Sequence, residues 1–203
     1  MLTFKRYITE ESPISSLSIF DIDDTLFKTK TKVHVIKNGK RVHSLNAAEF
    51  NVYKLKSGEE FDFGEFRSSA VFAKTAKPVD TVFKTAKKML ARFKSFAQKK
   101  IIIITAREDL DDKNLFLNTF KKYGFDINRV HVHRAGNLGI PGPEAKAKIT
   151  ADYLSKTNYS IVRMFDDAVS NLKAFLNLKN KFPNVKFEAF FIHENGTITR
   201  YGD

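Results

Sequence analysis

Short apolar runs rich in β-branched residues recur five times along the chain, and amphipathic helical patterns separate most of them. Such runs predict buried strands, and apolar residues at spacings of three and four predict helices. Strands that alternate with helices form βαβ units, so we expect an α/β fold with a three-layer, doubly wound parallel sheet, whose ligands bind beyond the carboxyl ends of the strands. The expected strands span 18–21, 101–105, 129–133, 161–165 and 185–192, and the expected helices span 79–98, 108–123, 143–155 and 168–181.

About fifty residues after the first expected strand break this alternation. Asn38-Gly39, flanked by alternating apolar residues, is the strongest short hairpin pattern. A second β pair is expected over 51–55 and 61–66, and a last small hairpin over 194–200. The chain should therefore form one domain over 13–203, preceded by a separate segment at 1–12. A small β-rich insertion is expected at about 28–78.

The composition excludes several classes of protein. The 203 residues include no Cys, which rules out disulfide scaffolds, thiolate zinc sites, Fe–S clusters and Cys nucleophiles. No apolar run approaches the roughly 18 residues of a transmembrane helix. The first residues contain no apolar core of a signal peptide. We therefore expect a soluble, cytoplasmic protein without a membrane partner, and no sequence feature indicates an oligomeric state.

The net charge of +12 comes from one part of the chain. Residues 28–100 contain 18 basic and 6 acidic residues, whereas the remainder contains 17 of each. A basic field of this kind attracts polyanions, such as nucleic acid, or phosphorylated substrates. A solvated lysine-rich surface that only aids solubility explains the charge equally well.

Carboxylates gather at the ends of two expected strands. Asp21 ends the first strand and Asp23 and Asp24 follow it, and Asp166 and Asp167 follow a later strand. Buried carboxylates are costly unless a cation neutralises them, and the oxygen-seeking ion Mg²⁺ is suited to this. If the two strands are neighbours, these side chains meet at one edge of the sheet. Helix or turn capping is the simpler explanation for Asp24 and Asp167 taken singly.

Two further elements point to the same edge. The second expected strand ends in Thr105, followed by Arg107, which places a hydroxyl and a guanidinium group where the sheet opens. Lys146 and Lys148 lie in the first turns of the next helix but one, and a helix N-terminus attracts anions. We prefer Lys146 because it lies nearer the start of that helix. Carboxylates, a hydroxyl and a lysine together suit phosphoryl transfer to a carboxylate nucleophile.

These residues form four motifs along residues 18–171, and the set resembles the haloacid dehalogenase (HAD) superfamily, mostly Mg²⁺-dependent phosphatases. The motifs are, in order, Asp21-Ile22-Asp23-Asp24-Thr25, Thr105, Lys146 (or Lys148) and Asp166-Asp167.

The resemblance implies a catalytic role for four residues. Asp21 is the expected nucleophile, which forms an aspartyl-phosphate. Asp23 is the expected acid for the leaving oxygen and then the base for water, and an aspartate here favours a phosphatase over a dehalogenase. Thr105 and Lys146 are expected to hold the phosphoryl oxygens.

The resemblance also implies a metal site. Mg²⁺ is expected to bind Asp21, Asp166 and the backbone carbonyl of Asp23, with Asp167 in or near the coordination shell.

The substrate expected from the resemblance is large. The Thr105-Ala106-Arg107 turn and residues 166–171 resemble the phosphatase half of polynucleotide repair enzymes. No GxxxxGK[ST] loop occurs in the 203 residues, so we expect no kinase half. The insertion is small, and in this superfamily a small cap leaves the site open. We therefore expect phosphorylated nucleic acid ends or nucleotides as substrates.

Side chains near and within the insertion are expected to extend the site. Lys28, Lys30 and Lys32 alternate with threonines and so share one face. We expect Lys28 and Lys30, together with Thr25 and Arg107, to bind substrate. The aromatic residues of the insertion either stack on bases or form its own small core, and we favour the core. They are Tyr53, Phe61, Phe63 and Phe66.

The first ten residues resemble the capsid-targeting leader on internal head proteins of T-even-type bacteriophages, which a phage protease removes after a hydrophobic-x-Glu triplet. The triplet here is Ile8-Thr9-Glu10. The leader implies a phage enzyme that is packaged in the virion and delivered into the host cytoplasm. An ordinary amphipathic helix is the alternative.

Two other functions stay open. The chain could be a catalytically silent nucleic-acid-binding or virion protein that retains the fold, although the presence of Asp21 and Asp23 favours an enzyme. It could also be a small-molecule phosphatase that makes no use of the basic stretch.

Overall fold

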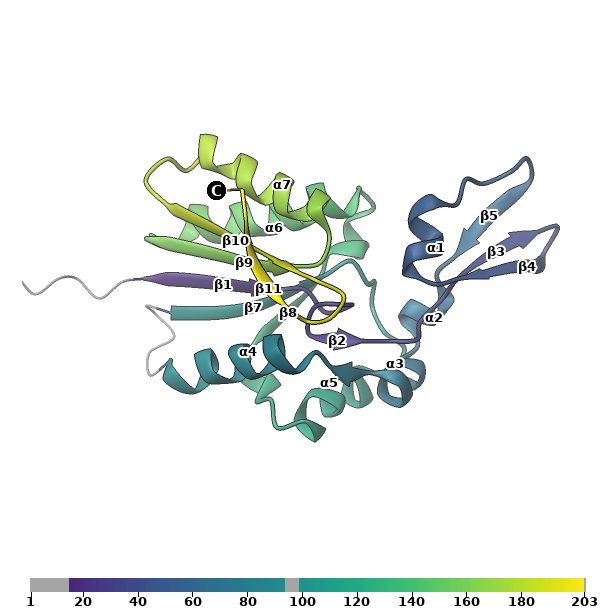
Figure 1. The fold of residues 1–203 in the computed structure, drawn as a ribbon, viewed down its shortest axis with the longest axis horizontal. Helices are drawn as coiled ribbons and strands as arrows, with labels where there is room; N and C mark the ends of the chain where they lie inside the picture. The colour runs from purple at the N-terminus through teal and green to yellow at the C-terminus, as the bar shows by residue number, and fades with distance from the viewer. Residues whose placement is uncertain (1–14, 94–98, 203) are drawn as a thin grey trace, which may run out of the picture.

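A six-stranded sheet forms the centre of the structure, a computed structural model that describes residues 15–93 and 99–202 (Figure 1). The expected leader at 1–12 lies outside these residues. The strand order is β11-β10-β9-β1-β7-β8, with only β11 antiparallel to its neighbour. The expected α/β class with a mostly parallel sheet is confirmed. The strands are β1 (Ser16–Phe20), β7 (Lys99–Thr105), β8 (His131–Arg134), β9 (Ile161–Asp166), β10 (Lys186–Ile192) and β11 (Ile198–Tyr201).

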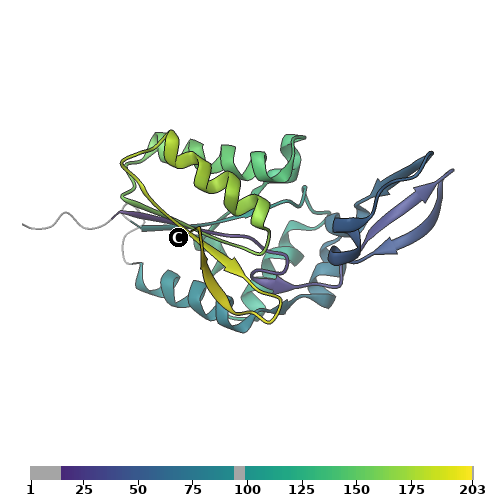
Figure 2. The same ribbon diagram turned by 45° about the horizontal axis from the view of Figure 1, so that its top comes forward.

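Helices cover both faces of this sheet (Figures 1 and 2). Along β1, Leu17 and Ile19 pack into one hydrophobic core and Phe20 into the other, which is the alternation of a strand buried on both faces. None of the helices within the described residues is long and apolar enough to cross a bilayer. One face carries α4 (Asp80–Arg92) and α5 (Lys113–Lys122), and the other carries α6 (Gly142–Lys156) and α7 (Val169–Asn177).

Several expected elements differ at their ends. The helix expected from 108 begins only at Lys113, because Asp112 accepts a hydrogen bond from the Leu115 N–H and caps it. Gly124 follows this helix with φ of 72°, the left-handed conformation that favours glycine. Arg129, expected in a strand, belongs to a 3₁₀ turn (Ile127–Arg129) before β8. The last small hairpin is present as β10 and β11.

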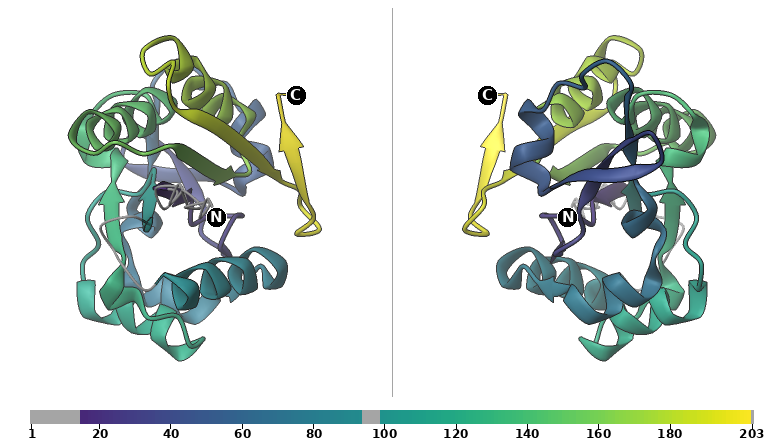
Figure 3. Two further views of the ribbon diagram at one scale, coloured as in Figure 1. Left: turned by 90° about the vertical axis from the view of Figure 1, so that its left-hand side faces the viewer. Right: turned by 90° about the vertical axis from the view of Figure 1, so that its right-hand side faces the viewer.

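A second sheet stands away from the central one (Figure 1), and we call residues 33–67 the lobe. The right-hand view of Figure 3 shows the lobe in front of the central sheet. Its strand order is β4-β3-β5. The lobe contains β3 (Val33–Lys37), β4 (Lys40–Leu45), α1 (Ala47–Val52), β5 (Glu59–Asp62) and α2 (Gly64–Arg67).

Of the two β pairs expected in the lobe, one is confirmed and one is wrong. Asn38 and Gly39 have φ of 51° and 72°, as a two-residue hairpin turn between β3 and β4 requires. The segment expected as a strand at 51–55 instead overlaps helix α1. Asn46 and Glu49 form a capping box that starts this helix, and β5 pairs with β3.

The chain leaves the central domain and returns to it at one place. β2 (Phe27–Lys28) pairs with β6 (Lys77–Pro78). Between the lobe and β6, α3 (Ser69–Thr75) places Phe72 in the same core as residues of α4 and α5. The last part of the segment expected as an insertion at 28–78 therefore packs with the central domain.

Candidate active site

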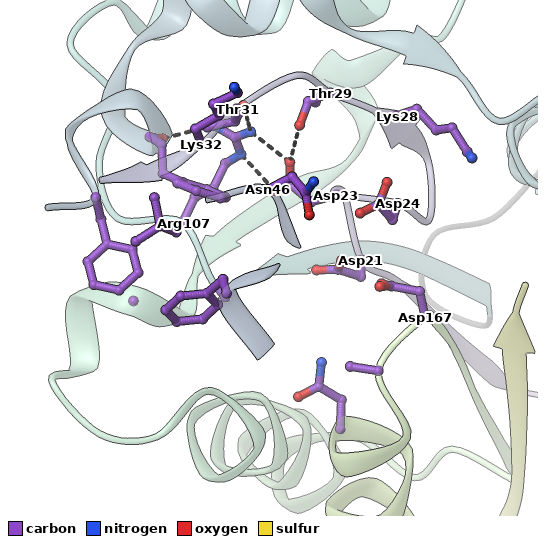
Figure 4. Close-up of a pocket in the computed structure, with 18 of the residues that line it drawn as sticks. Asp21, Asp23, Asp24, Lys28, Thr29, Thr31, Lys32, Asn46, Arg107 and Asp167 are labelled. Atoms are coloured by element: carbon purple, nitrogen blue, oxygen red, sulfur yellow. Dashed lines mark hydrogen bonds and ion pairs between the residues drawn. The ribbon is translucent and has the colours of Figure 1, made fainter. Parts of the chain in front are cut away.

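β1 lies between β7 and β9, so the residues that follow these three strands meet at one edge of the sheet. The chain runs from β1 out to β7 and β8, and then to β9 and β10 on the other side. Ligands of open α/β sheets bind at such a switch point. A cavity of about 1090 Å³ opens here between the sheet edge and the lobe (Figure 4).

Lys146 joins two of the predicted carboxylates. Its Nζ donates to Asp21 Oδ1 and to Asp166 Oδ2, each at 2.7 Å, and all three side chains are buried. Burial lowers the pKa of Lys146, but Asp166 and Asp21 outweigh this effect and raise it. Lys148 lies on the exposed face of α6. The geometry therefore brings Lys146, and not Lys148, to the carboxylates.

Three carboxylates form a candidate metal site. Oxygen atoms of Asp21, Asp166 and Asp167 lie within 4.8 Å of one another. Burial raises the pKa of Asp21 well above its usual value, against the opposing effect of Lys146. Burial, with a contribution from Asp166, raises the pKa of Asp167 to about 7. The cluster holds more negative charge than Lys146 neutralises, and its hard oxygen ligands suit a divalent cation.

Two side chains orient this carboxylate cluster. Asn171 Nδ2 donates to Asp166 Oδ1 at 2.8 Å, and the Ala168 N–H donates to the same oxygen at 2.9 Å. Thr25, expected to bind substrate, is fully buried, and its hydroxyl donates to Asp167 Oδ1 at 3.1 Å. Asn171 was not among the predicted site residues. Its position in the first turn of α7, directly after the strand that ends in Asp166, is the signal that could have identified it.

Asp23 is held by Arg107, away from the candidate metal site (Figure 4). The Arg107 guanidinium donates to both Asp23 carboxylate oxygens, at 2.8 and 2.7 Å. It also donates to the Phe66 carbonyl at 2.9 Å and to the Thr31 hydroxyl at 3.1 Å, and its side chain is 0% exposed. Arg107, expected to bind substrate, thus links Asp23 to the lobe. That the backbone carbonyl of Asp23 binds the metal stays a prediction.

The threonines between the lysines also take part in this network. Thr29 donates to Asp23 Oδ1 at 3.1 Å, and Thr31 accepts from Arg107. Neither was predicted as a site residue. The alternation of lysine and threonine over 28–32 was the signal, because it places the hydroxyls on the face opposite the ammonium groups.

Thr105 ends β7 as predicted but does not line the cavity. Its side chain is fully buried, and its hydroxyl accepts a hydrogen bond from the Arg107 backbone N–H at 3.2 Å. Asp24 does line the cavity and has φ of 55°, a left-handed conformation that aspartate tolerates better than most residues. Burial raises its pKa.

Lys28, Lys30 and Lys32 are exposed and line the cavity, as their shared face predicted. The aromatic residues of the lobe pack against one another, as expected of a small core. Phe61 has ring centroids 5.0 Å from Phe50 and 6.3 Å from Tyr53. The packing leaves Phe63 42% exposed, so this core is open on the cavity side.

No protein-family model matches this chain, and no curated protein matches it in sequence.

Proposed function

We propose that this chain is a Mg²⁺-dependent phosphomonoester hydrolase of the HAD type that works through an aspartyl-phosphate intermediate. The observation that carries the proposal is the convergence of Asp21, Asp166 and Asp167 on the buried Lys146, at the switch point of a mostly parallel sheet. The strand order and the position of the lobe between β2 and β6 agree with a wound HAD domain that carries a small cap after its first strand.

The residues at this point fit Mg²⁺. Asp21, Asp166 and Asp167 would hold the ion through carboxylate oxygens, which are the ligands that Mg²⁺ prefers. When bound, the ion neutralises charge on the transferring phosphoryl group. The raised pKa values of Asp21 and Asp167 support this fit, because a cation would favour their charged forms.

In the first step, a carboxylate oxygen of Asp21 attacks phosphorus and the bond from phosphorus to the leaving oxygen breaks. The leaving oxygen takes its proton from Asp23. Lys146 keeps Asp21 oriented and adds positive charge beside the phosphoryl oxygens. Because Thr105 does not line the cavity, its expected contact with phosphate requires a shift of the turn after β7.

In the second step, Asp23 accepts a proton from water as the water attacks phosphorus, which releases phosphate and restores Asp21. In the structure, the Arg107 guanidinium donates to both carboxylate oxygens of Asp23. To act as an acid in the first step, Asp23 has to carry a proton and part from Arg107. Arg107 also contacts the lobe, so we expect the lobe to move when Arg107 parts from Asp23 in each catalytic cycle.

Nucleic acid ends or nucleotides are the proposed substrates, on the strength of the basic excess in residues 28–100 and the large cavity. A phage origin, packaging in the virion and action in the host cytoplasm rest on the resemblance of residues 1–10 alone. Mature protein in virions that begins at Glu11 is the expected outcome. Protein that keeps Met1 and occurs only in lysates would contradict it.

The proposal is tested by phosphate release from a panel of phosphate esters, with and without Mg²⁺. The panel contains phosphorylated oligonucleotides, mononucleotides, sugar phosphates and an aryl phosphate. We expect Mg²⁺-dependent release that falls by at least about 10³-fold in Asp21→Asn, because loss of a nucleophile removes the covalent path. Asp152→Asn, an exposed position on α6, is the matched control.

If the protein released phosphate from none of the substrates in the panel, the proposal would be refuted. If salt-sensitive binding of nucleic acid persisted in that case, it would favour the silent binding protein.

A further inference from the structure

The lobe side of the cavity carries phenyl rings that the fold leaves partly uncovered. Phe63 is exposed, whereas Phe50 and Phe66 are half-buried, and the Arg107 guanidinium lies 5.0 Å from the Phe66 ring. Phe50, Phe63 and Phe66 line the cavity, with ring centroids 5.7 Å apart for Phe50 and Phe63 and 6.4 Å apart for Phe63 and Phe66. Phe61 does not line the cavity but supports the Phe63 ring at 6.0 Å. Aromatic surface exposed inside a cavity marks a ligand site, because a stacking partner would remove it from water.

The connection between this aromatic surface and the carboxylates is cationic. Residues 28–32 lead from the turn that holds Asp23 to the lobe, and their three lysines line the cavity. Within the described part of the chain, the ammonium groups of Lys30 and Lys32 take part in no ion pair, whereas Arg67 pairs with Glu108. The two lysines therefore offer positive charge to a ligand.

The cavity is larger than a phosphate ester of a small alcohol needs. Its volume of about 1090 Å³ lies just above the range of ~300–1,000 Å³ for small-molecule sites. A ligand that spans the whole cavity must present an anion at the end with the carboxylates and lysines, and flat apolar rings at the lobe.

We infer that the substrate is the phosphorylated end of a single-stranded nucleic acid, an inference that rests on the proposed function. The terminal phosphate lies at Asp21, and the next phosphates of the backbone lie along Lys30 and Lys32. An unpaired base stacks on the Phe63 ring, with Phe50 beside it. An acidic phosphopeptide would satisfy the lysines but would leave the phenyl rings without regular stacking partners.

The strand must be unpaired for this arrangement. In a duplex, internal bases are covered on both faces by their neighbours and the terminal base is held in a pair, whereas a single strand can turn its bases onto aromatic side chains. A mononucleotide has no second phosphate and would leave Lys30 and Lys32 unused.

The test is binding of a fluorescent, terminally phosphorylated 12-nucleotide single strand to Asp21→Asn protein, which prevents turnover. Stacking contributes about 1–3 kcal/mol per base, so Phe63→Ala should weaken binding about 5- to 150-fold. Leu55→Ala is the matched control, because Leu55 is a lobe residue that is 44% exposed and does not line the cavity. We expect the Leu55→Ala protein to bind the strand with the same affinity as the Asp21→Asn parent.

Salt dependence tests the lysines separately. Each phosphate contact contributes about 0.7 to the slope of log affinity against log salt for a single strand. Lys30→Ala with Lys32→Ala should lower the magnitude of the slope by about 1.4, whereas Lys37→Ala with Lys40→Ala should not change it. Lys37 and Lys40 are exposed lobe residues outside the cavity.

Equal affinities of the Phe63→Ala and Leu55→Ala proteins would overturn the inference. So would equal affinity for the single strand and a blunt duplex, or tighter binding of an acidic phosphopeptide. The proposed function fails on a different observation, the absence of Mg²⁺-dependent phosphate release by the wild-type protein from every ester in the panel.

Discussion

Replacement of Lys146 by Met removes the only ammonium group that contacts both Asp21 and Asp166 within the described residues. Each contact is 2.7 Å long. At an effective dielectric constant of about 20, such a contact is worth roughly 6 kcal/mol before the cost of desolvation. Desolvation of three buried groups offsets most of this, and loss of one partner from a buried pair costs about 3–5 kcal/mol.

A second argument bounds this cost from above. Without Lys146, one of the two carboxyl groups can take up a proton and share it with the other. An aspartate in the unfolded chain has a pKa of about 3.9, so its protonation at pH 7.5 costs about 5 kcal/mol. This cost falls by about 1.4 kcal/mol for each unit by which the pH is lowered. The defect of the Lys146→Met protein should therefore shrink by about 2–3 kcal/mol at pH 5.5.

The assay is urea denaturation of the metal-free protein at both pH values. We expect Lys146→Met to lower the free energy of unfolding by about 3–5 kcal/mol at pH 7.5 and by much less at pH 5.5. Lys148→Met, two residues along α6 but exposed, should stay within about 0.5 kcal/mol of the parent. Equal midpoints for the two variants would refute the assignment of Lys146 as the counter-ion of the site.

Two further predictions concern the same site. The pKa of Asp167, raised to about 7, lies above its unfolded value of about 3.9. The native state therefore binds this proton more tightly, and the metal-free protein should lose up to about 4 kcal/mol of stability from pH 4 to pH 7. Asp167→Asn should flatten this slope in urea titrations with EDTA, and an unchanged slope would contradict the assignment. Arg107→Lys keeps the charge but loses the planar fork that holds Asp23, Thr31 and the Phe66 carbonyl. It should lower the unfolding free energy by about 1–3 kcal/mol, against no change for the exposed Arg92→Lys, and similar midpoints for both would count against this network.

Local sequence patterns predicted most of the elements. Continuous apolar runs predicted the strands of the central sheet, because a strand buried on both faces is apolar throughout. Apolar residues at spacings of three and four predicted the helices on its faces. The hairpin at Asn38-Gly39 was predicted for a local reason as well, since few other residues adopt the required positive φ. The prediction of a second β pair is wrong because the Asn46 and Glu49 capping box, a short-range signal for a helix, starts α1 in this segment.

The sequence by itself determined which residue types follow which strands, and therefore which chemistry the edge of the sheet can support. It did not determine how those side chains pair. Tertiary structure alone decided that Lys146 faces Asp21 and Asp166, that Thr25 contacts Asp167, and that Arg107 is used by Asp23 and the lobe. The physical reason is that these pairs join residues far apart in the chain, whose distances depend on the order of strands in the sheet and on the packing of helices against it. No local pattern contains that information.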